Sequence, residues 1–258
     1  MFNTTDIPKS SRITRLVDHL YEKMPVIESA RAKLITESYQ ATEGKPMITR
    51  RAEAFAHILR HIPIIIRDEE LIVGSSTIAP RGCQTYPEFS YQWLEDELDT
   101  VETRSADPTK QELREVHKYW KGKTTSELAT SYMAPEAIKA IEHNIFTPGN
   151  YFYNGVGHVT VKYEEVLAIG YEGIMAKAQA ELDRCQVGDG DYARRSRFLN
   201  AVILSCQAVM EYAQRYAALA EKMAAECSDP VRRNELEVIA LNCSRVPAKG
   251  AGSFYEAC

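Results

Sequence analysis

Hydrophobic residues recur at helical spacing along most of this chain. Ile13, Leu16, Val17 and Leu20 share one face of a predicted helix over residues 12–23, because side chains three or four positions apart lie on the same side. The same spacing predicts helices over residues 27–42, 49–61, 89–99, 109–120, 134–142, 163–184 and 194–227. Asp229-Pro230 supplies an N-cap and a first-turn proline for a further helix that extends to residue 243. The pattern predicts a mainly α protein.

The helical pattern breaks at three places. Residues 64–66 and 71–74 are short β-branched runs, which predict short extended segments and no large sheet. Residues 75–88 are rich in Ser, Thr, Pro and Gly and predict an irregular loop. Residues 147–160 contain three glycines and one proline, so they cannot form a regular helix.

The last residues of the sequence form an incomplete pattern. Residues 249–252 read as a loop, Ser253 is a candidate N-cap, and residues 254–258 begin an apolar helix. A helix of so few residues does not stabilise itself, because nucleation costs more than its few hydrogen bonds return. We therefore expect these 258 residues to be the front part of a longer chain.

Composition narrows the functional classes. The net charge of −5 and the dispersed Lys and Arg argue against a nucleic-acid partner. No apolar run approaches the roughly 20 residues that cross a bilayer, and the N-terminus does not resemble a secretory signal. The six cysteines are scattered, which favours reduced thiols in a cytoplasmic protein and predicts no metal site.

The glycine-containing loop over residues 150–160 carries the strongest candidate for ligand binding. Gly155 and Gly157 allow the backbone to approach a ligand closely, and His158 follows directly. A histidine there can donate and accept hydrogen bonds to a hydroxylated ligand, and Asn150 and Asn154 add amide groups. The alternative interpretation is a tight turn before a strand at residues 159–161, with a histidine satisfied by its neighbours.

Other candidate groups have simpler structural interpretations. His57 and His61 have metal-ligand spacing, but the H-E-x-x-H signature is absent, so a packed or surface pair is expected. Cys83 is interpreted as a plain free thiol. The acidic runs 69–70 and 95–97 are expected to be solvated faces, and the arginines at 194–197 to make surface contacts. Both tryptophans, at positions 93 and 120, are expected to anchor the core.

Several motifs resemble the N-terminal portion of the glycyl radical enzymes, the pyruvate formate-lyase-like family. They occur at residues 28–31, 42–46, 50–52, 66–74, 80–81, 87–89 and 93–99. Thr124–Met133 and Tyr153–Val159 are similar to the coenzyme-B12-independent glycerol dehydratase branch, which also acts on 1,2-propanediol. The resemblance implies that residues 1–258 are the N-terminal helical region of an α/β barrel enzyme, with the remaining barrel and the glycyl radical domain outside this sequence.

The resemblance also implies a chemistry and its partners. In the family, an activating enzyme with S-adenosylmethionine and an iron–sulfur cluster makes a glycyl radical, which passes to a cysteine that takes a hydrogen atom from the diol. The neighbouring hydroxyl then leaves as water and an aldehyde forms, without cobalamin. Such enzymes are homodimers, and some reside in protein microcompartments.

Only substrate-binding roles carry over to this sequence. The resemblance implies that His158 hydrogen-bonds the substrate hydroxyls and assists hydroxyl departure, and that Asn150 lies in the same pocket. None of the six cysteines matches the radical cysteine, so the chain alone is expected to hold no catalytic radical residue, no cofactor and no activity. Two alternatives stay open: a non-catalytic helical binding or scaffold remnant, and another family branch such as a hydroxyproline dehydratase, a choline lyase or a formate C-acetyltransferase homologue.

Overall fold

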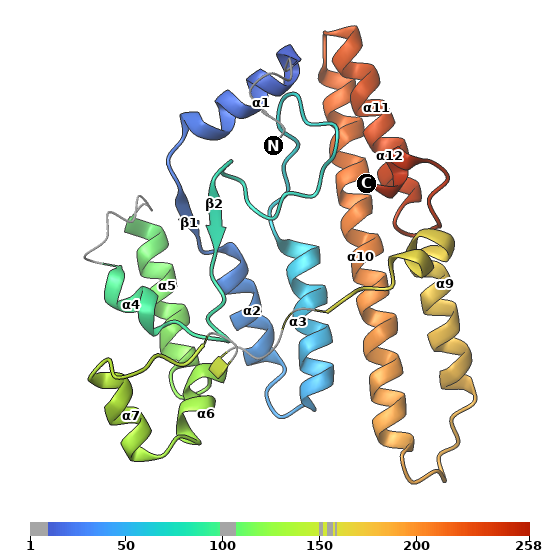
Figure 1. Ribbon diagram of the computed structural model, residues 1–258. Coiled ribbons are helices and arrows are strands. Elements are labelled where there is room, and N and C mark those ends of the chain that lie inside the picture. Colours follow the sequence, from blue (N-terminus) through green and yellow to red (C-terminus); the bar gives the residue numbers. More distant parts are fainter. Residues whose placement is uncertain (1–9, 99–106, 150–151, 154–156, 158) are drawn as a thin grey trace, which may run out of the picture.

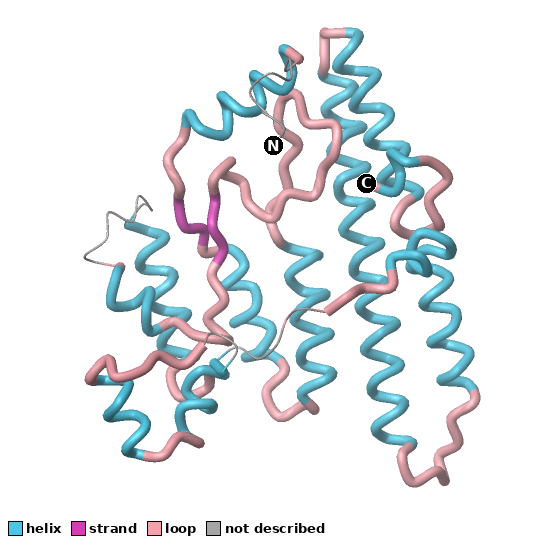
Figure 2. Tube along the Cα trace, viewed as in Figure 1, coloured by secondary structure: helices cyan, strands magenta, loops and turns pink. Residues whose placement is uncertain are grey.

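Helices dominate the computed structural model, which describes residues 10–98, 107–149, 152–153, 157 and 159–258. Figure 1 shows the order of the elements along the chain and Figure 2 their type. The helices are α1 (Ser11–Glu22), α2 (Ala30–Ala41), α3 (Met47–His61), α4 (Gln92–Glu97), α5 (Asp107–Trp120), α6 (Thr125–Ser131), α7 (Pro135–Glu142), α9 (Tyr163–Asp183), α10 (Tyr192–Glu226), α11 (Pro230–Arg245) and α12 (Phe254–Ala257). The predicted mainly α class is confirmed.

The strands of the described part of the chain differ from the predicted ones. β1 (Val26–Glu28) and β2 (Gly82–Gln84) form a two-stranded parallel sheet in which Val26 lies opposite Gly82. The predicted extended runs 64–66 and 71–74 are coil, so that prediction was wrong. The Glu28 carboxylate supports the sheet, since it accepts hydrogen bonds from the backbone N–H groups of Ile78 (3.1 Å) and Ala79 (2.7 Å).

The 35-residue helix α10 packs against three other helices, α3, α9 and α11, as Figure 1 shows. Its buried positions are mostly small residues, namely Ala201, Cys206, Ala208, Ala217, Ala220 and Ala224, with the larger Tyr216 among them. Small side chains let neighbouring helices approach closely. Arg215 on α10 donates hydrogen bonds to the carbonyl groups of Leu59 and Ile62, both 2.6 Å, at the end of α3. A cation there satisfies carbonyl groups that the helix leaves free.

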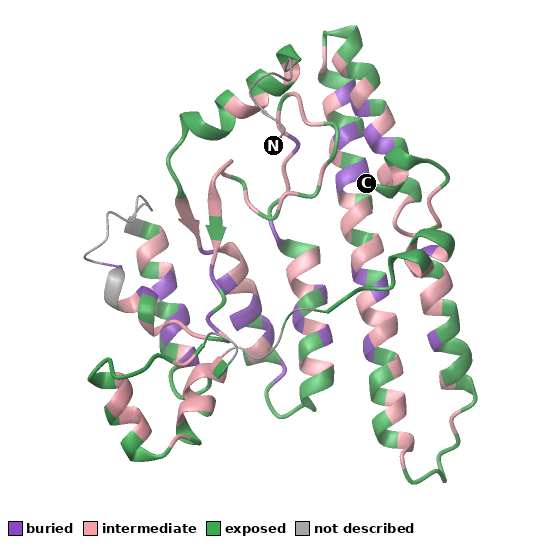
Figure 3. Cartoon of the chain, in the orientation of Figure 1, coloured by how far each residue is buried: buried purple, intermediate pink, exposed green. Residues whose placement is uncertain are grey.

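Two hydrophobic clusters hold the fold, and Figure 3 shows where buried residues lie along the helices. The first core comprises Ala32, Ile35, Ala54, Leu94, Leu98, Leu113, Val116 and Trp120. The second core comprises Ile66, Tyr216, Ala220, Ala224, Leu236, Ile239 and Ala240. The first core joins α2, α3, α4 and α5, and the second joins α10 and α11 to the segment that follows α3.

The tryptophan prediction is half right. Trp120 is buried, and its indole N–H donates to the Thr36 hydroxyl at 2.8 Å. Trp93 is 58% exposed and therefore does not anchor the core in this structure. Helix α4 begins at Gln92 and turns its Leu94 side chain into the first core instead.

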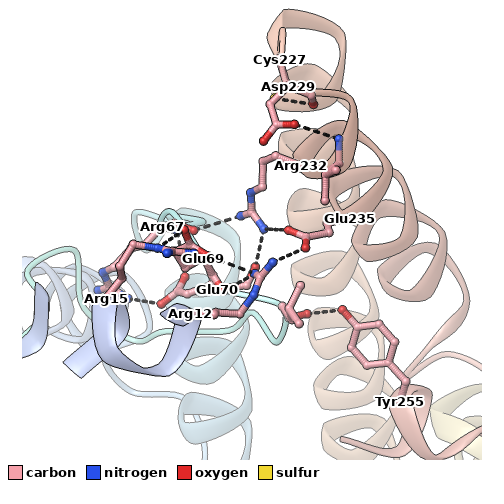
Figure 4. Close-up of polar contacts among 12 residues, drawn as sticks. Arg12, Arg15, Arg67, Glu69, Glu70, Cys227, Asp229, Arg232, Glu235 and Tyr255 are labelled. Carbon is pink, nitrogen blue, oxygen red and sulfur yellow. Dashed lines mark hydrogen bonds and ion pairs between the residues drawn. The ribbon is translucent and has the colours of Figure 1, made fainter. Parts of the chain in front are cut away.

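In the two acidic runs, the side chains of Glu69 and Glu95 are partly exposed, as predicted, but each also has an ionic partner. Glu69 pairs with Arg15 (2.6 Å) and with Arg12 (3.6 Å), as Figure 4 shows. The hydrogen bond from Arg15 lowers the pKa of the Glu69 carboxyl. In the second run, Glu95 makes a short hydrogen bond to Nδ1 of the buried His117.

An ionic cluster joins α1, the segment after α3, and α11 (Figure 4). Arg12 bonds to Glu235 on α11, and Arg232 donates to the carbonyl groups of Glu70 (2.8 Å) and Arg67 (3.1 Å). These contacts bridge segments more than 150 residues apart in sequence, because the separation from Glu70 to Arg232 is 162 residues. The cluster fixes α1 to the second core although α1 has no buried residue of its own.

Candidate functional site

The two predicted substrate-binding residues, His158 and Asn150, lie outside the described residues. Their described neighbours are Phe152, Tyr153, Gly157 and residues 159–162. The Phe152 and Tyr153 rings meet edge to face with centroids 5.4 Å apart. Residues 159–161 form no strand, so the strand in the alternative interpretation of this loop is absent.

The chain enters and leaves this loop through exposed apolar side chains. Ile145 and Phe146 precede it, and Val159, Val161 and Tyr163 follow it; all five are exposed. Both described ends of the loop therefore expose large apolar side chains.

Helix α6, immediately before α7, was missed in the sequence. Its N-cap, Thr124, forms a capping box with Glu127: each side chain bonds to the other residue's backbone N–H. Burial raises the pKa of the Glu127 carboxyl, but hydrogen bonds from Gly122 and Thr124 outweigh burial and the pKa is lowered. The N–H groups of Thr125 and Ser126 bond to the carbonyl groups of Glu88 (3.1 Å) and Phe89 (2.9 Å). In this structure the Thr124–Met133 motif positions a helix.

A cavity of about 420 Å³ lies among α9, α10, α11, α12 and residues 71–74. Aliphatic side chains line it together with five tyrosines: Tyr163, Tyr171, Tyr212, Tyr216 and Tyr255. Burial raises the pKa of Tyr171 and of Tyr255 above the ordinary tyrosine value. The Tyr255 hydroxyl donates to the Leu71 carbonyl, and the Tyr216 hydroxyl donates to the Ser75 carbonyl at 3.1 Å. Sequence patterns could not find this cavity because its walls come from distant segments.

The histidine pair, Cys83 and Arg194 lie as the sequence predicts. His57 contacts Glu37 (Nε2 to Oε2, 3.1 Å), and Nδ1 of His61 lies 2.8 Å from the His57 carbonyl oxygen. Within the described ranges, no three His, Cys, Asp or Glu side chains are grouped to hold a metal ion. Cys83 is an exposed free thiol. Arg194 pairs with Asp191 at the surface. Among the described helices, none is both long enough and apolar enough to span a bilayer.

Comparison with known proteins identifies the family. The chain belongs to the pyruvate formate lyase-like family, whose model matches residues 5–258. The resemblance that the sequence motifs indicated is thereby confirmed.

Similar proteins include enzymes that dehydrate diols. A solved structure concerned with 1,2-propanediol dehydration in Roseburia inulinivorans is 61% identical, with a TM-score of 0.93, and the match covers 100% of this chain and 33% of that one. The glycerol-bound B12-independent glycerol dehydratase from Clostridium butyricum is 49% identical, with a TM-score of 0.91, over 97% of this chain and 33% of that one. A (2S)-3-sulfopropanediol dehydratase from Klebsiella oxytoca is 33% identical over 257 residues.

The present sequence is shorter than these proteins. It spans about a third of the length of the curated relatives that it matches, 31% in the case of the Klebsiella enzyme. Each match covers nearly the whole of this chain, so the similarity is continuous and is not confined to one motif.

Proposed function

We propose that this chain forms one third of a glycyl radical diol dehydratase that converts 1,2-propanediol or glycerol to an aldehyde. The observation that supports this proposal most strongly is the 61% identity, over the whole chain, with the Roseburia protein of 1,2-propanediol dehydration. The identity falls to 33% for the dehydratase of a sulfonated diol. The difference favours an uncharged diol as the substrate.

In this proposal the chain contributes substrate binding. The glycyl radical, installed by an activating enzyme with S-adenosylmethionine and an iron–sulfur cluster, supplies hydrogen-atom abstraction through a cysteine in the rest of the enzyme. His158 donates a hydrogen bond to a diol hydroxyl and assists its departure as water, since an imidazole transfers protons near neutral pH. Asn150 orients the diol through its side-chain amide. No cobalamin takes part, and the complete enzyme is a cytoplasmic homodimer.

The experiment uses the enzyme expressed with the coding sequence that follows this chain, activated without oxygen. Wild-type enzyme is expected to form propanal from 1,2-propanediol. His158→Ala is expected to lower kcat/KM about 100-fold or more, because general acid–base groups contribute roughly 10²–10⁴-fold. His143→Ala is the matched control, since His143 is an exposed histidine beyond the end of α7. Equal activity of the two variants would contradict the role of His158.

The alternative is a helical scaffold without catalysis. It predicts that the isolated chain is monodisperse and unfolds cooperatively. Large apolar side chains are exposed on several helices, among them Leu128, Leu241 and Phe254, and exposed patches of this kind promote association. We therefore expect the isolated chain to aggregate and to dehydrate no diol. A soluble monomer with a sharp thermal transition would support the scaffold.

A further inference from the structure

Helix α9 changes direction at Gly170. The sequence predicts an unbroken helix there, but Gly170 has φ 63° and ψ −177°. This region of backbone conformation is open almost only to glycine. A β-carbon at Gly170 would lie 2.3 Å from the Ala248 carbonyl oxygen and 2.6 Å from the Lys249 Cα. No other residue fits at this position without a backbone shift.

Residues 247–251 pack into the bend of α9 at Gly170. The N–H groups of Tyr171 and Glu172 donate to the carbonyl groups of Pro247 and Ala248, and the N–H of Ala251 donates to the Leu167 carbonyl, all at 2.9 Å. These bonds satisfy backbone groups that a bent helix leaves free. We call residues 167–172 and 247–251 together the clasp.

Gly250 is the counterpart of Gly170 in the clasp. A β-carbon at Gly250 would lie 2.3 Å from the Ala168 carbonyl oxygen. Each of the two segments thus contributes one glycine at the point where the other backbone comes closest. The clasp consists of backbone packed on backbone, so its geometry has little freedom to adjust.

The bend folds the first part of α9 back toward the second. Glu165 forms ion pairs with Lys162 (3.0 Å) and with Lys177 (2.5 Å). Positions 165 and 177 would be about 18 Å apart along a straight helix, because each residue rises 1.5 Å. The pair therefore forms only when α9 is bent. Hydrogen bonds from Lys177 and Lys162 lower the pKa of Glu165 to about 2.

We propose that the clasp is a positioning device for the diol site, with Gly170 and Gly250 as its positioning residues. The inference rests on the proposed function, in which the loop ending before Val159 binds the diol. Val159–Lys162 run directly into the folded-back part of α9. The clasp sets the direction of that part and hence the place where the loop presents its side chains. A misplacement of about 1 Å remote from the chemistry can reduce the rate about 100-fold.

The kinetic test uses Gly170→Ala and Gly250→Ala in the activated complete enzyme. Both are expected to lower kcat/KM for 1,2-propanediol about 10- to 100-fold, mainly through a higher KM. Gly188→Ala is the matched control, because Gly188 follows α9 and a β-carbon added there would have no described atom within 4 Å. Values within two-fold of wild type for both clasp variants would overturn the proposal.

If the alanine variants do not fold, Lys177→Gln tests the role of the clasp instead. It removes an exposed ion pair and leaves both glycines in place. Its kcat/KM is expected to fall about two- to five-fold while the variant stays folded, because an exposed ion pair contributes little to stability. Lys222→Gln is the control, because Lys222 is an exposed lysine of α10. Equal kinetics for the two lysine variants would overturn the proposal.

Amide hydrogen exchange across residues 1–258 of the complete enzyme separates this inference from the proposed function, because it requires neither activation nor turnover. Gly250→Ala is expected to speed exchange at Tyr171, Glu172 and Ala251 and across residues 159–169, with α10 unchanged. Exchange that is unaltered, or faster throughout α10 as well, would overturn the clasp. A wild-type enzyme that turns over no diol would overturn the proposed function and leave this exchange result standing.

Discussion

The two cores of this chain are built from different side chains. The first core packs Leu94, Leu113 and Trp120 together with the β-branched Ile35 of α2 and Val116 of α5. The second core sets Ala220, Ala224 and Ala240 around a few large side chains such as Tyr216 and Leu236. The first core is dominated by large side chains, whereas alanines at the contact allow α10 and α11 to approach closely. We therefore expect the first core to lose most stability when a side chain is truncated, and the second core when a side chain is enlarged.

Truncation in the first core gives the largest expected effect. Leu113 is fully buried, so Leu113→Ala should lower the free energy of unfolding by about 2–5 kcal/mol through lost burial and a residual cavity. Chemical denaturation measures the change. Leu128→Ala, at a position that is 58% exposed, is the control and should cost about 1 kcal/mol or less. Equal losses would show that the first core is not packed as described.

Enlargement in the second core comes next. Ala220 is fully buried on α10, and Ala220→Leu should cost about 1–3 kcal/mol because the helices cannot separate without losing other contacts. Ala225→Leu, at an exposed position on the same helix, should be nearly neutral. A stable Ala220→Leu variant with an unchanged melting temperature would remove the distinction between the two cores.

A buried hydrogen bond sharpens the comparison further, because it belongs to the first core. Thr36→Val keeps the side-chain shape but leaves the Trp120 indole N–H without its acceptor. The expected cost is about 1–3 kcal/mol for an unsatisfied buried donor. Thr14→Val on the exposed side of α1 serves as the control. Thermal melts that coincide for the two variants would contradict the role of this bond.

The smallest expected effect concerns pH. The folded-state pKa of Glu165 is about 2, below its ordinary value of 4.5. A lowered carboxyl pKa stabilises the fold above the unfolded-state value, and this contribution is lost as the pH falls from about 4.5 to about 2. In Glu165→Gln that part of the acid dependence should disappear from the melting temperature. An identical pH profile for wild type and variant would show that the ion pair with Lys177 does not form.

The sequence predicted the long helices well and the non-local features poorly. Helical periodicity is local, so α3 and α10 were placed within two residues of their ends. Helix α6 was missed because its sequence is short and largely polar. The sheet was misplaced because β1 and β2 pair across more than 50 residues. No local pattern encodes such pairing.

The candidate site was reached from the sequence only in part. His158 was singled out by its glycine-rich loop and by family resemblance, and its role stays a prediction. The bend at Gly170 was not foreseen, because a single glycine is compatible with a helical pattern. What distinguishes it is the approach of residues 247–251, which only the fold reveals. The tyrosine-lined cavity is likewise revealed only by the fold, because its walls come from distant segments.

The most direct test of the central claim is product formation from 1,2-propanediol. The complete enzyme that contains this chain should be activated without oxygen by its S-adenosylmethionine-dependent activating enzyme, and propanal should be measured with and without the diol. The account predicts propanal only with activated enzyme and diol together, and no requirement for cobalamin. Activated enzyme that carries a glycyl radical yet dehydrates neither 1,2-propanediol nor glycerol would contradict it.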